Sequence, residues 1–310
     1  MRTSRIAGWG TALPDKVVTN ADLEAMLDTS DEWIVERSGI RERRIGGTTS
    51  GLAVAAGRAA LHRAGVDPAS IGLLVLATST PDQTIPASSA TVQHQLGLSC
   101  GGFDVNAACS SFVYALVAAH QFVTGGVDRV LVIGAETMSR IIDWDDRSTA
   151  VLFGDGAGAF VLEAVDAPSD NLLAWDLGSN GALRSILDAD VGGFLQMEGK
   201  EVFRQAIRAV VDSAGRVMAS AGVDADDIAL VVPHQANVRI IDAVNAKLGF
   251  SIERTAVNLD RTGNTSSASI PMALAEAAEA GRLKPGDLVL FMGFGAGMTW
   301  ASAIMRWDAP

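Results

Sequence analysis

The sequence predicts an α/β protein in which buried sheets alternate with layers of helices. Residues 73–77 and 130–135 are continuous apolar runs, the pattern of strands buried on both faces in a parallel sheet. Hydrophobic residues make up 48% of the 310 residues and aromatic residues only 5%, while the 32 glycines suit elements packed at short distances. This length fits two domains of ordinary size or one large domain.

Local signals predict the elements of the first half in chain order. A strand over residues 6–13 is expected to run into a proline turn. Asn20 is expected to cap a short helix over residues 21–27, and Ser30 to begin a second helix ahead of Gly39. Apolar patterns bounded by turn residues predict the rest, namely helices over residues 52–64 and 86–96 and strands over residues 73–77, 130–135 and 159–163.

The segment from Phe103 to about Thr124 contains the candidate nucleophile. A short apolar strand end is followed by a nearly all-apolar run of helix formers, which predicts a buried helix. Asn106 is placed to be its N-cap, which would make Cys109 the third helical residue. The helix dipole would then lower the pKa of the Cys109 thiol and favour the nucleophilic thiolate. A small buried residue in a tight helix start explains the same stretch equally well.

The second half of the chain repeats the pattern of the first. Three short matches occur in the same order, residues 64–67 with 221–224, 128–132 with 286–290, and 153–157 with 294–297. We therefore expect two similar βα halves, residues 1–165 with the cysteine and residues 166–310 with a histidine and an asparagine, which build a site where they meet. The first match is offset by 157 residues, and the position 157 residues after Cys109 is Ser266, which lies at a second expected helix start. Both helix N-termini would then face one anionic site.

Polar stretches of the second half supply the remaining chemistry. His234 follows a buried strand end and precedes a helix expected over residues 238–248, a position typical of functional side chains, although a structural histidine is the alternative. Asn264, at a helix start, is an N-cap or an N–H donor, and the turn at residues 295–297 could leave backbone N–H groups free for an oxyanion hole. A thiolate, a neutral imidazole and a carboxamide, without a carboxylate partner, suit acyl transfer to Cys109 followed by enolate stabilisation. Such a reaction needs no metal or organic cofactor.

Six motifs together resemble those of β-ketoacyl-acyl-carrier-protein synthase III, the initiating ketoacyl synthase of the thiolase superfamily, over essentially the whole chain. They are DTSDEWI at residues 28–34, AACS at 107–110, FGDGAGA at 153–159, VPHQAN at 232–237, GNTS at 263–266 and GAGMTW at 295–300. The resemblance implies a thiolase-like fold with five layers, αβαβα. It also implies the initiating condensation of type II fatty-acid synthesis, in which acyl-CoA acylates Cys109 and a decarboxylative Claisen condensation with malonyl-acyl-carrier protein follows.

The resemblance further implies a catalytic triad of Cys109, His234 and Asn264. His234 Nε2 and Asn264 Nδ2 would donate to the malonyl thioester oxygen, and the backbone N–H groups of Cys109 and Ala296 would form the oxyanion hole. The family often has glycine where Ala296 stands, which a backbone donor tolerates. Ile85 matches the residue that closes the acyl pocket across a dimer interface, and its size predicts room for propionyl, branched or somewhat longer primers.

Two surface sites are implied by the same resemblance. The CoA site would contain Trp33, Arg37, Arg147, Gly199, Phe203 and Asn237, and the carrier-protein docking patch would contain Arg204, Arg239 and Lys247. A further basic position of the family patch is Ala246 here, so the patch is expected to be weaker.

The composition narrows the partners and the location. The formal net charge of −12 argues against non-specific nucleic-acid binding. No apolar run reaches the length of a membrane span, and the start of the chain lacks the apolar core of a signal peptide. Two cysteines, Cys100 and Cys109, make no disulfide framework, and no Cys/His cluster has metal-ligand spacing. We expect a cytoplasmic homodimer that acts on acyl-CoA and malonyl-acyl-carrier protein, with no cofactor beyond the thioester substrates.

Several related activities remain as alternatives. A thiolase needs a second catalytic cysteine late in the chain, an elongating synthase a second histidine, and hydroxymethylglutaryl-CoA synthase a glutamate that no matched position supplies. Chalcone-type synthases are longer, and no Gly-x-Ser-x-Gly elbow supports a hydrolase. A starter-unit synthase or acyltransferase of a polyketide pathway, and a non-catalytic acyl-CoA-binding protein, stay open.

Overall fold

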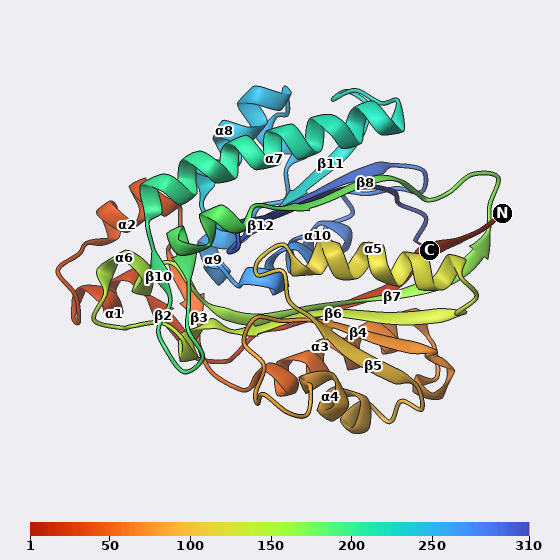
Figure 1. The fold of residues 1–310 in the computed structure, drawn as a ribbon, viewed down its shortest axis with the longest axis horizontal. Helices are drawn as coiled ribbons and strands as arrows, with labels where there is room; N and C mark the ends of the chain where they lie inside the picture. The colour runs from red at the N-terminus through yellow and green to blue at the C-terminus, as the bar shows by residue number, and fades with distance from the viewer. Residues whose placement is uncertain (310) are drawn as a thin grey trace.

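Strands from the two halves of the chain form two separate sheets (Figure 1). The computed structural model describes residues 1–309; Pro310, the last residue of the predicted second half, lies outside them. The first sheet has the order β1-β7-β6-β4-β5, with bounds Arg2–Ala12, Asp155–Asp166, Arg129–Thr137, Leu73–Ala77 and Gly101–Val105. The second has the order β8-β13-β12-β11, with bounds Leu172–Ser179, Thr299–Arg306, Leu288–Gly295 and Ile228–Pro233.

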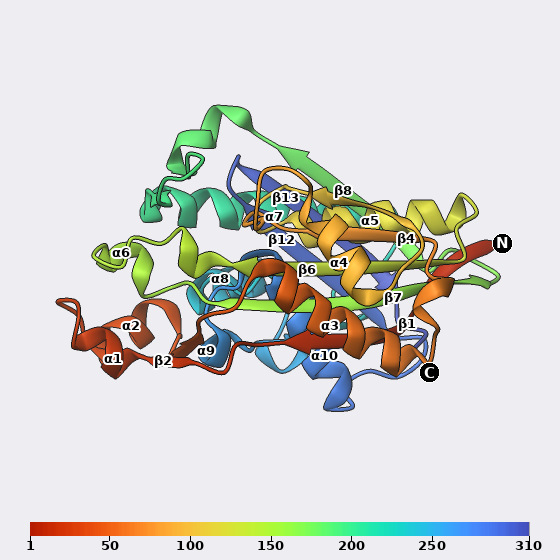
Figure 2. The same ribbon diagram turned by 90° about the horizontal axis from the view of Figure 1, so that it is seen from below.

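Two helices lie between the sheets and pack against strands of both, α5 (Ser111–Thr124) and α10 (Ser269–Glu279). On the outer face of the first sheet lie α3 (Thr49–Ala64) and α4 (Ser88–Leu96) (Figures 1 and 2). The outer face of the second sheet is covered by α7 (Gly199–Ala221), with α8 (Val238–Leu248) beside it. The molecule therefore has the predicted five layers of a thiolase-like fold.

Glycines set the short distances between these layers. A Cβ on Gly10 of β1 would lie 2.4 Å from the carbonyl oxygen of Ala56 on α3. A Cβ on Gly134 of β6 would lie 2.4 Å from the carbonyl oxygen of Ser267, which precedes α10. Since backbone atoms at such distances cannot move aside as side chains do, these positions require glycine.

The two sheets repeat one topology. β4–β6 and β11–β12 are parallel pairs, and each sheet continues through two antiparallel pairs, β6–β7–β1 and β12–β13–β8. The second sheet lacks a full counterpart of β5, but Val231 makes an isolated parallel bridge to Thr255 where that strand would lie. The helix ends also correspond, because α3 and α7 both stop at a left-handed glycine, Gly65 (φ 64°) and Gly222 (φ 67°).

The turns that precede the two central helices correspond residue by residue. Ala108 and Ser266 are the only non-glycine residues with positive φ among residues 1–309, at 51° and 49°. Asn106 Oδ1 accepts the N–H of Ala108, and Asn264 Oδ1 accepts the N–H of Ser266. The local offset is therefore 158 residues, one more than that of the first sequence match, and it pairs Asn106 with Asn264 and Cys109 with Ser267.

These turns correct the predicted start of the central helix. Asn106 is not the N-cap and Cys109 is not helical, since α5 begins at Ser111 with Ser110 as its N-cap. The physical reason is that Asn106 caps a tight turn instead, by accepting the Ala108 N–H at 3.0 Å, and the left-handed conformation of Ala108 cannot continue into a helix.

The remaining elements gather at one end of the molecule (Figure 1). Thr19, not Asn20, caps α1 (Asn20–Glu24), because Thr19 and Asp22 form a capping box. Ser30 caps α2 (Asp31–Ser38), as predicted, and Gly39 ends it. The others are β2 (Val17–Thr19), β3 (Glu42–Arg44), α6 (Arg147–Ala150), β9 (Leu187–Asp188), β10 (Gln196–Met197) and α9 (Leu259–Thr262).

None of the helices in the part of the chain that the structure describes is both long enough and apolar enough to span a membrane.

Candidate active site

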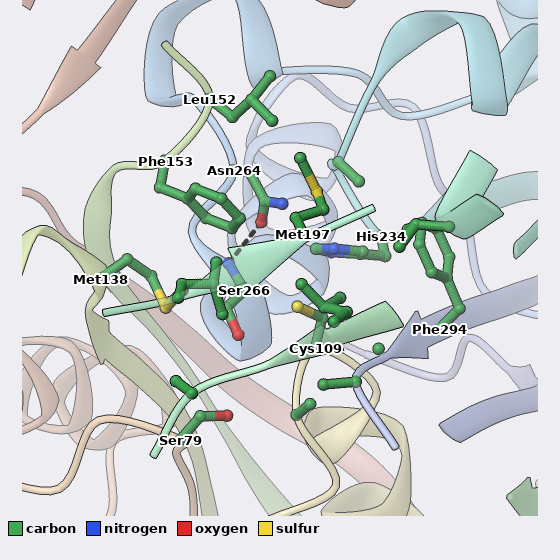
Figure 3. A pocket seen from close by; sticks show the side chains of 18 of the residues that line it. Ser79, Cys109, Met138, Leu152, Phe153, Met197, His234, Asn264, Ser266 and Phe294 are labelled. Atoms are coloured by element: carbon green, nitrogen blue, oxygen red, sulfur yellow. Dashed lines mark hydrogen bonds between the residues drawn. The ribbon is translucent and has the colours of Figure 1, made fainter. Parts of the chain in front are cut away.

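A cavity of about 300 Å³ lies where the two halves of the chain meet (Figure 3). Cys109, His234 and Asn264 all line it, from the turn after β5, the loop after β11 and the turn before α10. Ser266 also lines it, so the turns that precede the two central helices both reach this cavity. Much of the remaining wall is apolar and includes Met138, Ile141, Leu152, Phe153, Leu187, Leu195, Met197, Val202, Ile240 and Phe294.

The cysteine is a neutral thiol in the resting protein. Burial raises the pKa of the Cys109 thiol to about 12; the Ser266 hydroxyl acts against this rise and the carboxyl of Glu136 adds to it. The predicted lowering of this pKa is therefore wrong. A helix dipole contributes at most about 1–2 kcal/mol, and Cys109 lies outside the helix, so desolvation decides the protonation state.

The histidine is neutral, as predicted. His234 is 3% exposed, and burial lowers the pKa of its imidazole to about 3. Its Nδ1 lies 2.7 Å from Ser269 Oγ, which also accepts the N–H of Gln235 at 3.3 Å. When the Ser269 hydroxyl donates to Nδ1, the ring proton of His234 lies on Nε2.

The asparagine is held by the first half of the chain. Its backbone N–H donates to Leu152 O at 2.8 Å, and its carbonyl oxygen accepts from the N–H of Gly154 at 3.0 Å. The side-chain Oδ1 accepts the N–H of Ser266 at 2.8 Å (dashed line in Figure 3). Since Oδ1 is used in this way, the amide group Nδ2 of Asn264 is the end left to act as a donor.

Two backbone N–H groups complete the polar part of the cavity wall. Within the described residues 1–309, neither the Cys109 amide nor the Ala296 amide donates to a protein oxygen. The segments that carry them touch, because a Cβ on Gly295 would lie only 2.5 Å from the Cys109 nitrogen. Thr299 Oγ1 joins the segments further by hydrogen bonds to Ala107 O at 2.8 Å and Ala296 O at 3.1 Å. Free donors at such a junction are the requirement for binding an oxyanion.

A buried carboxylate that the sequence analysis did not expect lies behind the cavity wall. Glu136 of β6 has no exposed surface and accepts from the hydroxyls of Ser266 at 3.1 Å and Ser267 at 2.8 Å. Among the described residues its hydrogen-bond partners do not include Cys109, His234 or Asn264, so Glu136 borders the triad and is not its carboxylate partner. One signal was available in the sequence, since Glu136 directly follows the apolar run at residues 130–135.

Three of the predicted CoA-binding residues contact one another. The guanidinium carbons of Arg37 and Arg147 each lie 4.7 Å from the centroid of the Trp33 ring. Arg147 also donates to Asp28 O at 2.6 Å. None of the three side chains lines the cavity. A base stacked on Trp33 in place of a guanidinium group would therefore require that arginine to move.

The other three predicted CoA-binding residues, Gly199, Phe203 and Asn237, do line the cavity. Asn237 joins this group to the first, because its Nδ2 donates to Arg37 O at 2.8 Å while its Oδ1 caps α8. Asn237 thus links the cavity wall to the group formed by Arg37, Trp33 and Arg147.

The predicted docking residues lie around a groove between α7 and α8. Arg204 and Lys247 line this groove, and Arg239 lies over the Phe203 ring at 5.7 Å. Arg204 also pairs with Glu201 at 2.7 Å. Arg208, which was not predicted, also lines the groove, and its i+4 spacing to Arg204 on one helix is the signal in the sequence for it. The apolar groove residues are Phe203, Ile207 and Val211.

Ile85 is 85% exposed and does not line the cavity of its own chain. A role for it in closing the acyl pocket therefore requires a second copy of the chain and stays a prediction.

The fold and the site define a thiolase-fold condensing enzyme, with a thiol, an imidazole and a carboxamide in one cavity. A family model described as 3-oxoacyl-[acyl-carrier-protein (ACP)] synthase III matches residues 103–181. The model for the C-terminal part of the same family matches residues 218–307. The β-ketoacyl-[acyl-carrier-protein] synthase III of Erythrobacter litoralis is 52% identical over 99% of this chain and 100% of its own.

Solved structures agree with this assignment. The 3-oxoacyl-[acyl-carrier-protein] synthase III of Aquifex aeolicus superposes with a TM-score of 0.95 at 45% identity, covering 98% of this chain and 100% of that one. The priming β-ketosynthase of the R1128 polyketide pathway has a TM-score of 0.94 at 39% identity, covering 100% and 97%. The chain belongs to the β-ketoacyl-[acyl-carrier-protein] synthase III family, the initiating condensing enzymes of fatty-acid synthesis.

Proposed function

We propose that Cys109 is acylated by an acyl-CoA and that the acyl group is then condensed with malonyl-acyl-carrier protein. The observation that supports this most directly is the presence of Cys109, His234 and Asn264 in one largely apolar cavity. The site residues come from both halves of the chain, residues 1–165 and 166–310, as we expect for a duplicated fold with its site at the junction.

In the first step, Sγ of Cys109 forms a bond to the acyl carbon and the bond from that carbon to the CoA sulfur breaks. The tetrahedral oxyanion accepts from the N–H groups of Cys109 and Ala296, and one such donor is typically worth about 3 kcal/mol. The thiol proton ends on the CoA thiolate, which leaves as a neutral thiol. Because the resting sulfur is protonated, the step includes the loss of the thiol proton from Cys109.

In the second step, the malonyl group loses CO₂ and its electron pair forms an enolate. The enolate oxygen accepts from His234 Nε2–H and Asn264 Nδ2–H, and both groups stay neutral at physiological pH. The enolate carbon then attacks the acyl carbon, the bond to Sγ of Cys109 breaks, and the sulfur takes up a proton. A neutral imidazole suits this role, since a cation would hold the substrate carboxylate and oppose its loss as CO₂.

The two substrates use different surfaces. The CoA nucleotide binds at Trp33, Arg37 and Arg147, where stacking replaces one of the existing guanidinium contacts. The acidic carrier protein docks at Arg204, Arg239 and Lys247, beside the groove between α7 and α8. These three positive side chains, on a chain whose net charge is −12, would orient the carrier protein and speed its association.

The primer is selected across a dimer interface. In a cytoplasmic homodimer, Ile85 of each chain would close the acyl cavity of the other, and its modest size admits propionyl, branched or somewhat longer groups. Ile85→Phe is expected to restrict turnover to acetyl-CoA in an acyl-chain series. A wild-type enzyme that turns over acetyl-CoA alone would contradict this assignment.

The division of labour is tested by His234→Ala. The intact mass of the protein after incubation with acyl-CoA reports acylation, and CO₂ release from malonyl-carrier protein reports decarboxylation. We expect acylation to persist and decarboxylation to fall by at least about 10²-fold, the usual size of one lost transition-state donor. Equal loss of both steps would contradict the assignment, and no adduct on Cys109 in the wild type would favour mere acyl-CoA binding.

A starter-unit synthase of a polyketide pathway is the second candidate, because the polyketide priming synthase is similar over its whole length. The two candidates share their chemistry and differ in the carrier protein that they accept. Condensation rates with purified fatty-acid and polyketide carrier proteins would distinguish them.

A further inference from the structure

Glu136 takes no part in the steps above, yet its carboxylate joins the two halves of the chain behind the cavity. It accepts from both Ser266 and Ser267 of the second half. From the first half it accepts the Thr78 hydroxyl at 3.2 Å, the Ser79 N–H at 3.0 Å, and the Thr80 N–H at 3.0 Å and hydroxyl at 2.5 Å. A buried group surrounded by donors in this way acts as a fixed acceptor.

Ser266 connects this carboxylate to the cavity. Its hydroxyl donates to Glu136, while its backbone N–H donates to Asn264 Oδ1 at 2.8 Å. Ser266 has a φ of 49°, an uncommon conformation for a residue with a Cβ, which persists only when surrounding contacts hold it. Glu136 supplies such a contact, so the direction of the Asn264 amide depends on it.

The duplicated turn in the first half offers a comparison. Asn106 accepts the N–H of Ala108 just as Asn264 accepts that of Ser266. Ala108 has no hydroxyl, and the first copy is reached only indirectly, through Ser79, whose N–H donates to Glu136 and whose hydroxyl donates to Asn106 Oδ1 at 3.5 Å. Direct anchoring by Glu136 is therefore confined to the copy whose asparagine is placed to act on substrate.

We propose that Glu136 is a positioning residue of the condensation, which acts through Ser266 to keep Nδ2 of Asn264 directed into the cavity. This inference rests on the proposed function of Asn264. It requires no contact between Glu136 and the substrate. We expect Glu136 to affect the rate of decarboxylation more than the rate of Cys109 acylation.

The test compares Glu136→Gln with Asp155→Asn. Asp155 is an equally buried carboxylate next to Gly154, which holds the Asn264 backbone, but its side-chain partners are Ser139 and the N–H of Gly46, so it lacks the link through the Ser266 hydroxyl. Each variant is assayed for Cys109 acylation by intact mass, CO₂ release from malonyl-carrier protein, and melting temperature. We expect Glu136→Gln to slow CO₂ release at least about tenfold and acylation less than about threefold, as for a misplaced donor. Asp155→Asn should lower the melting temperature and leave the ratio of the two rates unchanged.

A double-mutant cycle with Asn264→Ala separates positioning from general damage. If Glu136 acts through Asn264, Glu136→Gln should slow CO₂ release no further in the Asn264→Ala background. Additive losses, or an unchanged ratio in Glu136→Gln alone, would overturn the inference. If Asn264→Ala itself keeps full CO₂ release, the proposed function fails instead.

Ser266→Ala is the alternative test variant if Glu136→Gln does not fold. It removes the hydroxyl that donates to Glu136 and keeps the backbone N–H that donates to Asn264. It should shift the ratio of the two rates in the same direction, and an unchanged ratio would equally overturn the inference.

Discussion

A methyl group added at Gly295 is predicted to impair acylation by displacing the turn that carries Cys109. The new Cβ would lie 2.5 Å from the Cys109 nitrogen and 2.9 Å from Ala108 Cβ. The first neighbour is backbone, so the turn must move by about half an ångström or more before the contact becomes tolerable. Overpacking of this kind typically costs about 1–3 kcal/mol of stability.

The effect on rate follows from the oxyanion hole. Moving the Cys109 N–H away from the developing oxyanion forfeits up to about 3 kcal/mol, so Gly295→Ala should slow acylation by about 10²-fold. Decarboxylation relies on His234 and Asn264 and should slow less than about tenfold. Rapid-quench mass spectrometry with acyl-CoA would measure the first rate, and CO₂ release the second.

Gly215→Ala on α7 is the matched control, because its Cβ would meet no atom within 4 Å. It should leave both rates unchanged and stabilise the helix by up to about 1 kcal/mol. A Gly295→Ala protein that loses stability but acylates at the wild-type rate would refute the assignment of the Cys109 amide to the oxyanion hole.

Three further predictions concern protonation and docking. In a Cys100→Ser background, the rate of Cys109 alkylation by iodoacetamide should rise about tenfold per pH unit from about pH 6.5 to 9. The reason is that the pKa of the Cys109 thiol is about 12 and only the thiolate reacts. A rate that reaches a plateau near neutral pH would contradict this. Because the pKa of His234 is lowered to about 3 by burial, only the unfolded chain binds this proton between about pH 3 and 6.5. The unfolding free energy should therefore fall by about 1 kcal/mol per pH unit on acidification, relative to His234→Gln, in denaturant titrations at pH 6 and 5; a constant difference would exclude the effect. Reversing the charges of Arg208 and Lys247 to Glu should raise the KM for malonyl-carrier protein at least about tenfold at low salt without changing acylation by acyl-CoA, and an unchanged KM would place docking elsewhere.

The sequence predicted much of the fold because its signals are local and repeated. The strand at residues 73–77 and the helix at residues 238–248 were predicted with the bounds that the structure has. Each is an apolar segment with clear turn residues beside it. The matches between the halves predicted the common topology of the two sheets for the same reason, since each copy carries its own pattern.

The predictions that failed concern a local backbone conformation and a group whose state depends on distant parts of the chain. Asn106 has the composition of an N-cap, and only the left-handed Ala108 shows that it caps a turn instead. Cys109 has the sequence context of an activated thiol. The burial that raises its pKa comes from both halves of the chain, and Glu136 adds to it from a neighbouring strand.

By itself, the sequence indicated the layered α/β class and the internal duplication through apolar patterns and internal matches, and the three side chains that meet in the cavity through the resemblance of its motifs to a known family. The tertiary structure alone decided which groups are charged, which atoms of His234 and Asn264 remain free to donate, and which carboxylate stands behind them. Desolvation and hydrogen bonding are set by neighbours more than a hundred residues away in sequence, as in the contact of Glu136 with Ser266.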